Sequence, residues 1–150
     1  MTPIRRATAN DAMAIRNLTR ECYRKWISVI GREPRPMSAD YLKAVQKHWI
    51  DLVDRDGALA ALIEMIPAEN HLLIENLAVA PRYQRQGLGN HLTAHALEAA
   101  RSAGFSEVRL YTNAAFAENL EYYRRRGFVQ TAHEPLPDGG TMVHFTKPVS

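Results

Sequence analysis

The stretch from Leu72 to Asn90, LLIENLAVAPRYQRQGLGN, constrains the fold more than any other part of the chain. Residues 72–79 are apolar except for Glu75 and Asn76. A run of this length bounded by turn signals predicts a buried central strand. The strand should end at Pro81, because proline cannot donate to a sheet ladder.

Two glycines follow this strand and introduce a helix. Gly87 and Gly89 allow the backbone to bend tightly and to approach a ligand closely. Residues 90–101 then have helical composition and spacing. Several backbone N–H groups therefore converge at a helix start, where the helix dipole favours negative charge. The stretch predicts a site for a phosphate or a pyrophosphate.

The rest of the chain predicts one α/β (α+β) domain over residues 1–150. Alternation in residues 49–54 indicates a half-buried strand, and Ser38 is the expected cap of a helix of about ten residues. The strand at 108–112 follows a helical crossover, so it should run parallel to the strand at 72–79. The predicted order is β-α-α-β-β-β-α-β-α-β-β. We expect strands at residues 3–7, 49–54, 58–66, 72–79, 108–112, 128–131 and 142–146, and helices at residues 12–30, after Ser38, and at residues 90–101 and 118–126.

Composition and charge argue against a membrane-spanning, a secreted or a nucleic-acid-binding protein. The chain of 150 residues is 46% hydrophobic and has no apolar run long enough for a transmembrane helix. It opens without an apolar segment typical of a secretory signal. The lone Cys22 cannot form an internal disulfide, so we expect a cytoplasmic protein. A net charge of +3 is compatible with an anionic cofactor, whereas nucleic acid binding is not expected without a clustered basic patch.

Two motifs resemble those of the GNAT family of N-acetyltransferases. The family's acyl-CoA motif (Gln or Arg, two residues, Gly, one residue, Gly or Ala) is matched by residues 84–89, Gln-Arg-Gln-Gly-Leu-Gly, directly after the strand NLAVAP. A second family feature, a helical tyrosine four residues before Gly-Phe, is matched by Tyr123, Gly127 and Phe128. The order of elements agrees along almost the whole chain. The resemblance implies a mixed, mostly antiparallel sheet of six to seven strands flanked by about four helices.

The resemblance also implies an acetyl-CoA site. The loop N–H groups would hold the pyrophosphate, the backbone at the end of the strand would pair with the pantetheine arm, and Arg82 and Arg85 would flank the phosphates. Asn119 would reach the pantetheine or its amide. The cofactor-binding residues expected on this basis are Leu77, Ala78, Val79, Gln84, Arg85, Gln86, Gly87, Leu88, Gly89, Asn90, Asn119 and Tyr122.

The chemistry of such a transfer suggests two catalytic side chains. An alkylammonium of pKa about 10.4 must lose a proton before it attacks a thioester. Glu75, an acid within an apolar run, is the expected general base, directly or through water. The Val79 N–H would stabilise the oxyanion, and Tyr123 would protonate the departing CoA thiolate. No covalent acyl-enzyme is needed, and Cys22 is expected to be a core or half-buried thiol.

The acceptor is expected to be a primary amine on a small molecule or a peptide. Its pocket should be formed by the first two helices and their loop, a segment rich in aromatic residues that also contains a carboxylate. We expect Tyr23, Trp26, Ile27, Glu33 and Met37 to line it, together with Pro34, Pro36 and Tyr41. A homodimer is the expected assembly, and neither a membrane nor a metal is an expected partner.

Several alternatives stay open at this point. The chain could be a CoA-binding regulatory or interaction module without catalysis. Tyr122 and Tyr123 could exchange roles, and Glu75 could be an ordinary salt-bridged strand residue. Arg124, Arg125 and Arg126 fit a solvated helix face, although a tRNA contact would also suit them. His91 and His95 are four residues apart on one helix, but without a zinc signature they are expected to be surface residues.

Overall fold

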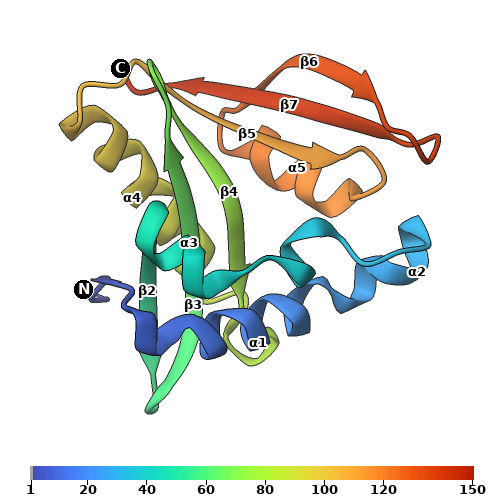
Figure 1. Cartoon of the computed structure of the whole chain (residues 1–150). Helices are drawn as coiled ribbons and strands as arrows, with labels where there is room; N and C mark the ends of the chain where they lie inside the picture. Colours follow the sequence, from blue (N-terminus) through green and yellow to red (C-terminus); the bar gives the residue numbers. More distant parts are fainter. Residues whose placement is uncertain (1) are drawn as a thin grey trace.

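A computed structural model of the chain describes residues 2–150 (Figure 1). A seven-stranded sheet forms its centre, in the order β1-β2-β3-β4-β5-β7-β6. The order of elements and the mixed sheet confirm the predicted fold. The strands are β1 (Arg5–Arg6), β2 (Trp49–Arg55), β3 (Ala58–Pro67), β4 (His71–Val79), β5 (Glu107–Asn113), β6 (Val129–Pro135) and β7 (Thr141–Pro148), and the helices are α1 (Ala12–Tyr23), α2 (Ile27–Ile30), α3 (Tyr41–Lys47), α4 (Leu88–Ser102) and α5 (Ala117–Arg125).

The first expected helix is interrupted rather than continuous. α1 and α2 are separated by a 3-10 turn at Arg24–Trp26, and the helical segment ends at Gly31. Gly31 has a φ of 75°, the left-handed conformation that closes many helices. The expected cap of the following helix was wrong. Ser38 lies in a 3-10 turn, and the Asp40 carboxylate instead accepts a bond of 3.2 Å from the Lys43 N–H.

β2 also differs from its prediction. Residues 50–53 are buried without alternation. The cause is that both faces of the sheet are covered here, by α1 and α3 on one side and by α4 on the other (Figure 1). Asp51 is consequently buried, and its carboxylate accepts from Arg6 Nε and pairs with His95 Nε2, each at 2.6 Å. No helix within residues 2–150 is long and apolar enough to cross a membrane.

Every strand pair is antiparallel except β4 with β5. This parallel pair confirms the crossover expected from the sequence. Its pairing covers only residues 71–74 of β4 against residues 107–110 of β5, although both strands continue beyond it. The two strands therefore diverge halfway along the sheet, next to α5 (Figure 1).

A bulge in β4 occurs at the point of divergence. Ile74 pairs with Met65 of β3 and Asn76 pairs with Glu64, so Glu75 is the extra residue. The bulge changes which side chains face which core. Ile74 packs with α4, whereas Ala78 packs with α1 and α3 on the opposite face. In a regular strand without a bulge, the side chains of Ile74 and Ala78 would lie on the same face of the sheet.

Candidate functional site

The second half of β4 presents unpaired backbone groups to the gap beside β5. The Ala80 N–H donates to the Ala60 carbonyl of β3 at 2.8 Å. Because successive residues of a strand direct their backbone groups to opposite sides, those of Leu77 and Val79 point away from β3. The Val79 carbonyl accepts from Gln84 Nε2 at 3.0 Å and from Cys22 Sγ at 3.2 Å. The N–H groups of Leu77 and Val79 and the Leu77 carbonyl remain directed into the gap.

The loop after β4 has the backbone form of an anion site. Arg85 and Gly87 both adopt left-handed conformations, with φ of 65° and 86°. When successive residues alternate between right- and left-handed backbone conformations, their N–H groups point into one concave site. α4 begins immediately afterwards at Leu88, so the N–H groups of its first turn point to the same place. Gln86 points elsewhere, because its Oε1 accepts from Arg55 Nη1 of β2 at 2.6 Å.

A groove connects this loop with α5, and we call it the loop groove. It contains most of the residues expected to bind a cofactor. Two of the expected residues are not in its wall: Ala78 is buried against α1 and α3, and Gln86 faces the β2–β3 hairpin. The loop groove is lined by Tyr23, Lys25, Leu77, Val79, Gln84, Arg85, Gly87, Leu88, Gly89, Asn90, Glu118, Asn119, Tyr122, Tyr123 and Arg126.

Arg126 is a groove residue that the sequence interpretation missed. Its Nη1 donates to the Tyr122 carbonyl at 2.8 Å, its guanidinium lies 3.4 Å from the Tyr122 ring centroid, and its Nε contacts Asn90 Oδ1. The available signal was its position one turn after Tyr122, which directs it back toward the loop. Arg82, which was expected near the phosphates, is exposed over the Tyr83 ring and outside the groove.

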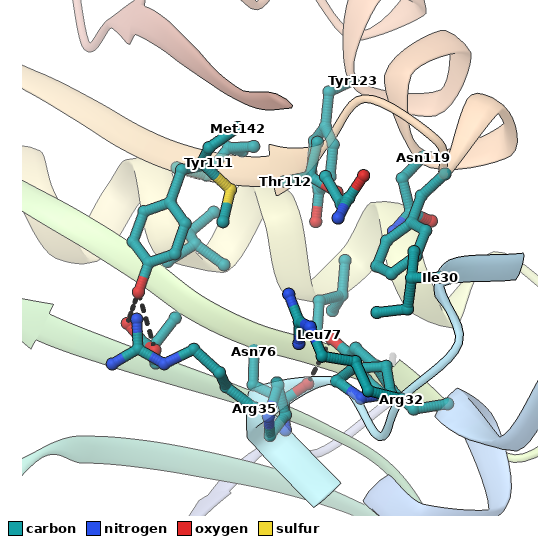
Figure 2. Close-up of a pocket in the computed structure, with 18 residues that line it drawn as sticks. Ile30, Arg32, Arg35, Asn76, Leu77, Tyr111, Thr112, Asn119, Tyr123 and Met142 are labelled. Atoms are coloured by element: carbon teal, nitrogen blue, oxygen red, sulfur yellow. Dashed lines mark hydrogen bonds between the residues drawn. The ribbon is translucent and has the colours of Figure 1, made fainter. Parts of the chain in front are cut away.

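A second hollow, which we call the side cavity, lies between the diverging strands (Figure 2). It encloses about 710 Å³ when its open mouth is included. It shares four residues with the loop groove: Tyr23, Leu77, Asn119 and Tyr123. Two separate binding spaces therefore meet at these side chains. The side cavity is lined by Tyr23, Ile30, Arg32, Pro34, Arg35, Pro36, Ile74, Glu75, Asn76, Leu77, Leu110, Tyr111, Thr112, Asn113, Phe116, Asn119, Tyr123 and Met142.

Tyr123 lies at the junction and Tyr122 does not. Tyr123 is 8% exposed, packs edge-on against Tyr122 and Phe128, and lines both spaces. Burial raises the pKa of the Tyr123 phenol well above its usual value, so the group is protonated at neutral pH. Tyr122 lines only the loop groove, where its hydroxyl lies 3.3 Å from Thr93 Oγ1.

Glu75 faces the side cavity from the bulge of β4. Both of its carboxylate oxygens accept from the Tyr111 hydroxyl of β5, each at 3.0 Å (Figure 2). Burial, followed by the negative charge of Glu75, raises the pKa of Tyr111 to about 12. Tyr111 is therefore a stable donor that orients the carboxylate, and sequence reasoning did not identify it.

Only part of the expected acceptor pocket lies in the cavity wall. Tyr23 is there, and its hydroxyl donates to Asn76 Oδ1 at 2.9 Å, as are Pro34 and Pro36. The other expected residues have different surroundings: Trp26 stacks on Phe116 with ring centroids 4.4 Å apart, Glu33 pairs with Arg20 at 2.8 Å, Met37 and Tyr41 are buried, and Ile27 is outside the wall. The buried side chains of Trp26, Met37 and Tyr41 pack in the protein interior instead of lining the cavity.

The remaining candidate side chains have structural partners. Cys22 is half-buried beside Val79, and burial raises the pKa of its thiol to about 11. His91 Nε2 contacts the Thr2 carbonyl at 2.9 Å, and His95 pairs with Asp51, so both are half-buried rather than surface residues. Within residues 2–150, no three His, Cys, Asp or Glu side chains are grouped as a metal site.

Comparison with known proteins places this geometry among acetyltransferases. Residues 12–128 match the family model described as Acetyltransferase (GNAT) family. The chain is 31% identical over 131 residues to the mycothiol acetyltransferase of Cellulomonas flavigena, which covers 75% of this chain and 38% of that relative. The chain thus spans well under half the length of this curated relative.

Solved structures share the fold at low identity. A GNAT-family protein from Desulfovibrio desulfuricans superposes with a TM-score of 0.82 at 20% identity over 100% of both chains. The PaiA N-acetyltransferase of Thermoplasma acidophilum, solved in complex with coenzyme A, gives 0.77 at 18% identity over 96% of this chain and 98% of that one. These likenesses show the fold.

Proposed function

The chain belongs to the acetyltransferase (GNAT) family, and on this premise we propose that it transfers the acetyl group of acetyl-CoA directly to an amine acceptor. The observation that carries the proposal is the meeting of the loop groove and the side cavity at Leu77, Asn119 and Tyr123. Two substrates that must react need two spaces with one shared boundary. A module that only bound CoA would not need the second space.

In this proposal the loop groove holds acetyl-CoA. The N–H groups from residue 85 to residue 90 bind the pyrophosphate at the start of α4, with the Arg126 guanidinium nearby. The pantetheine amides extend β4 as an added strand through the free Leu77 carbonyl and the free Val79 N–H. Asn119 contacts the pantetheine at the junction.

The side cavity holds the acceptor next to Glu75. The amine loses a proton to the Glu75 carboxylate, directly or through water, and then attacks the thioester carbonyl. Because the Val79 N–H pairs with the pantetheine in this arrangement, the Leu77 N–H, which is also directed into the gap, takes the oxyanion role expected of Val79. The tetrahedral intermediate collapses to the amide and expels the CoA thiolate, which takes a proton from Tyr123. One C–N bond forms and one C–S bond breaks. The nitrogen loses two protons in all, one to Glu75 before the attack and one as the amide forms. The second is balanced by the proton that the thiol gains and restores Tyr123, and the first passes from Glu75 to solvent.

Direct transfer is favoured over an acyl-enzyme route. The nucleophile of such a route would be a thiolate, yet burial raises the pKa of the Cys22 thiol to about 11. Its S–H donates to the Val79 carbonyl, so it is neutral and engaged at pH 7.

The test is release of free thiol from acetyl-CoA across a panel of amines, with calorimetry of acetyl-CoA binding on the same preparation. The proposal predicts micromolar to millimolar acetyl-CoA affinity and amine-dependent thiol release. Binding without release for any amine would favour a CoA-binding module instead. Absence of both binding and release would contradict the proposal as a whole.

Two expectations about the whole protein remain predictions. We expect a homodimer, and the completely exposed edge strand β6, with Val129 64% exposed, is the surface that favours it. Light scattering coupled to gel filtration measures this directly. The lone Cys22, which cannot form an internal disulfide, is what favours a cytoplasmic location.

A further inference from the structure

The wall of the side cavity contains one cation and one carboxylate that form no ion pair among residues 2–150. Three of its lining residues are charged: Arg32, Arg35 and Glu75. Arg32 has a partner outside the wall, because its Nε pairs with Asp138 Oδ2 at 3.1 Å. Glu75 accepts from the neutral Tyr111 hydroxyl, which leaves its charge uncompensated by that bond. The charge that remains to be explained is that of Arg35.

Arg35 directs an exposed guanidinium into the cavity. Its side chain extends from the loop after α2 toward Tyr111 (Figure 2), and among residues 2–150 it forms no ion pair. Its positive charge acts on Tyr111, where it opposes the larger effect of burial on the phenol pKa. Arg35 is therefore near the Tyr111–Glu75 pair, and its guanidinium N–H groups can donate hydrogen bonds to a ligand.

Charge balance distinguishes two kinds of acceptor. A polyamine or a lysine-rich peptide would need several carboxylates in the cavity, and Glu75 is the only one in its wall. A planar guanidinium is instead suited to a carboxylate, which it binds through two parallel hydrogen bonds. Much of the remaining wall is apolar, with Ile30, Pro34 and Phe116 among its members.

We propose that the acceptor is an amine that also bears a carboxylate, and that Arg35 binds this carboxylate while the amine faces Glu75. Amino acids with apolar side chains are the smallest compounds of this class, and short peptides with a free C-terminus are larger ones. The inference rests on the proposed acetyl transfer and names its substrate class. Arg35 acts here as a specificity-determining residue and does not touch the reacting atoms.

The experiment compares matched acceptors in matched variants. The acceptors are leucine, phenylalanine, 5-aminovalerate and a leucine dipeptide, each beside its primary amide. The proteins are wild type, Arg35→Gln, Arg35→Lys and the control Arg16→Gln, which changes an exposed arginine of α1 outside both hollows. Amidation alters the amine pKa of an α-amino acid, so an acid and its amide differ in reactivity in every protein. The quantity compared between the wild type and each variant is therefore the ratio of kcat/KM for the acid to kcat/KM for its amide, because the effect of the amine pKa is the same in all of them.

Arg35→Gln should lower kcat/KM for the acids by about 10-fold or more and change that for the amides by less than about 2-fold, as expected for loss of a charge-assisted pair. Arg35→Lys should recover part of the loss, and Arg16→Gln should behave as wild type. An acid-to-amide ratio that is the same in Arg35→Gln and wild type would overturn the inference.

Failure of the transfer itself is distinguishable from failure of this inference. If no amine releases thiol, the proposed function is contradicted, and calorimetric binding of the acids to CoA-saturated protein then decides the role of Arg35. Acid binding that Arg35→Gln weakens about 10-fold would support the carboxylate site. Binding that is absent, or equal in the two proteins, would overturn it.

Discussion

The loop groove and the side cavity meet at Tyr123, yet they are built in different ways. One wall of the groove comes from a single stretch of chain between Leu77 and Asn90, which presents backbone groups to it. The cavity is assembled from side chains of distant segments, including Arg35, Tyr111 and Met142. Under the proposed function, cofactor binding depends on backbone conformation, whereas acceptor choice depends on individual side chains. Changes to the two regions should therefore have separable effects.

The largest effect is expected from Gly87→Val. Gly87 has a φ of 86°, which a β-branched residue adopts only with strain, so the loop should lose its anion-binding form. We expect the Kd for acetyl-CoA to rise by about 100-fold or more, measured by calorimetry.

The matched control is Gly104→Val at the other end of α4, where φ is 85° and, as at Gly87, nothing lies within 4 Å of an added Cβ. It carries the same backbone cost and should keep the affinity of the wild type. If both variants lost the same affinity for acetyl-CoA, the cause would be general destabilisation of the fold. The loop at Gly87 would then have no special role in binding.

The next effect concerns the junction. Tyr123→Phe keeps the packing and removes the hydroxyl, so kcat should fall by about 100-fold while the Kd for acetyl-CoA changes by less than about 3-fold. Tyr122→Phe is the control, because Tyr122 lines only the groove, and its kcat should stay within about 3-fold. If Tyr122→Phe lowered kcat more than Tyr123→Phe, the general acid would be Tyr122 and Tyr123 would be a packing residue.

Glu75→Gln tests the cavity side of the junction. We expect kcat/KM for the amine to fall by about 10- to 100-fold at pH 7.5, with acetyl-CoA affinity unchanged. The defect should shrink as the pH rises, because more of the amine, with a pKa near 10.4, is then already deprotonated. Glu69→Gln, at an exposed turn, serves as control. If the loss of kcat/KM in Glu75→Gln were the same at every pH, Glu75 would not be the general base.

The smallest effect is expected for Cys22→Ser. A serine hydroxyl can replace the thiol as donor to the Val79 carbonyl, so activity should remain within about 3-fold of wild type. Since burial raises the pKa of Cys22 to about 11, its alkylation by iodoacetamide should be slow at pH 7 and accelerate throughout pH 8 to 10. Complete loss of activity in Cys22→Ser would reopen the acyl-enzyme route.

The groove could be predicted from the sequence and most of the cavity could not. The groove depends on local features that a sequence displays, namely an apolar run, Pro81 and Gly87 in a fixed order. The cavity depends on the bulge at Glu75 and on where separate strands diverge, which alternation alone does not reveal. Arg126 was missed for a related reason, because a run of arginines near a helix end usually indicates a solvated face.

The central claim is that the second half of β4 offers free backbone groups to acetyl-CoA, and amide hydrogen exchange tests it most directly. With saturating acetyl-CoA, exchange of the Leu77 and Val79 amides should slow by about 10-fold or more. The amides of residues 72–74, where β4 is paired on both sides, should be slow in both states. Unchanged exchange at Leu77 and Val79 in protein shown by calorimetry to be saturated would contradict the account.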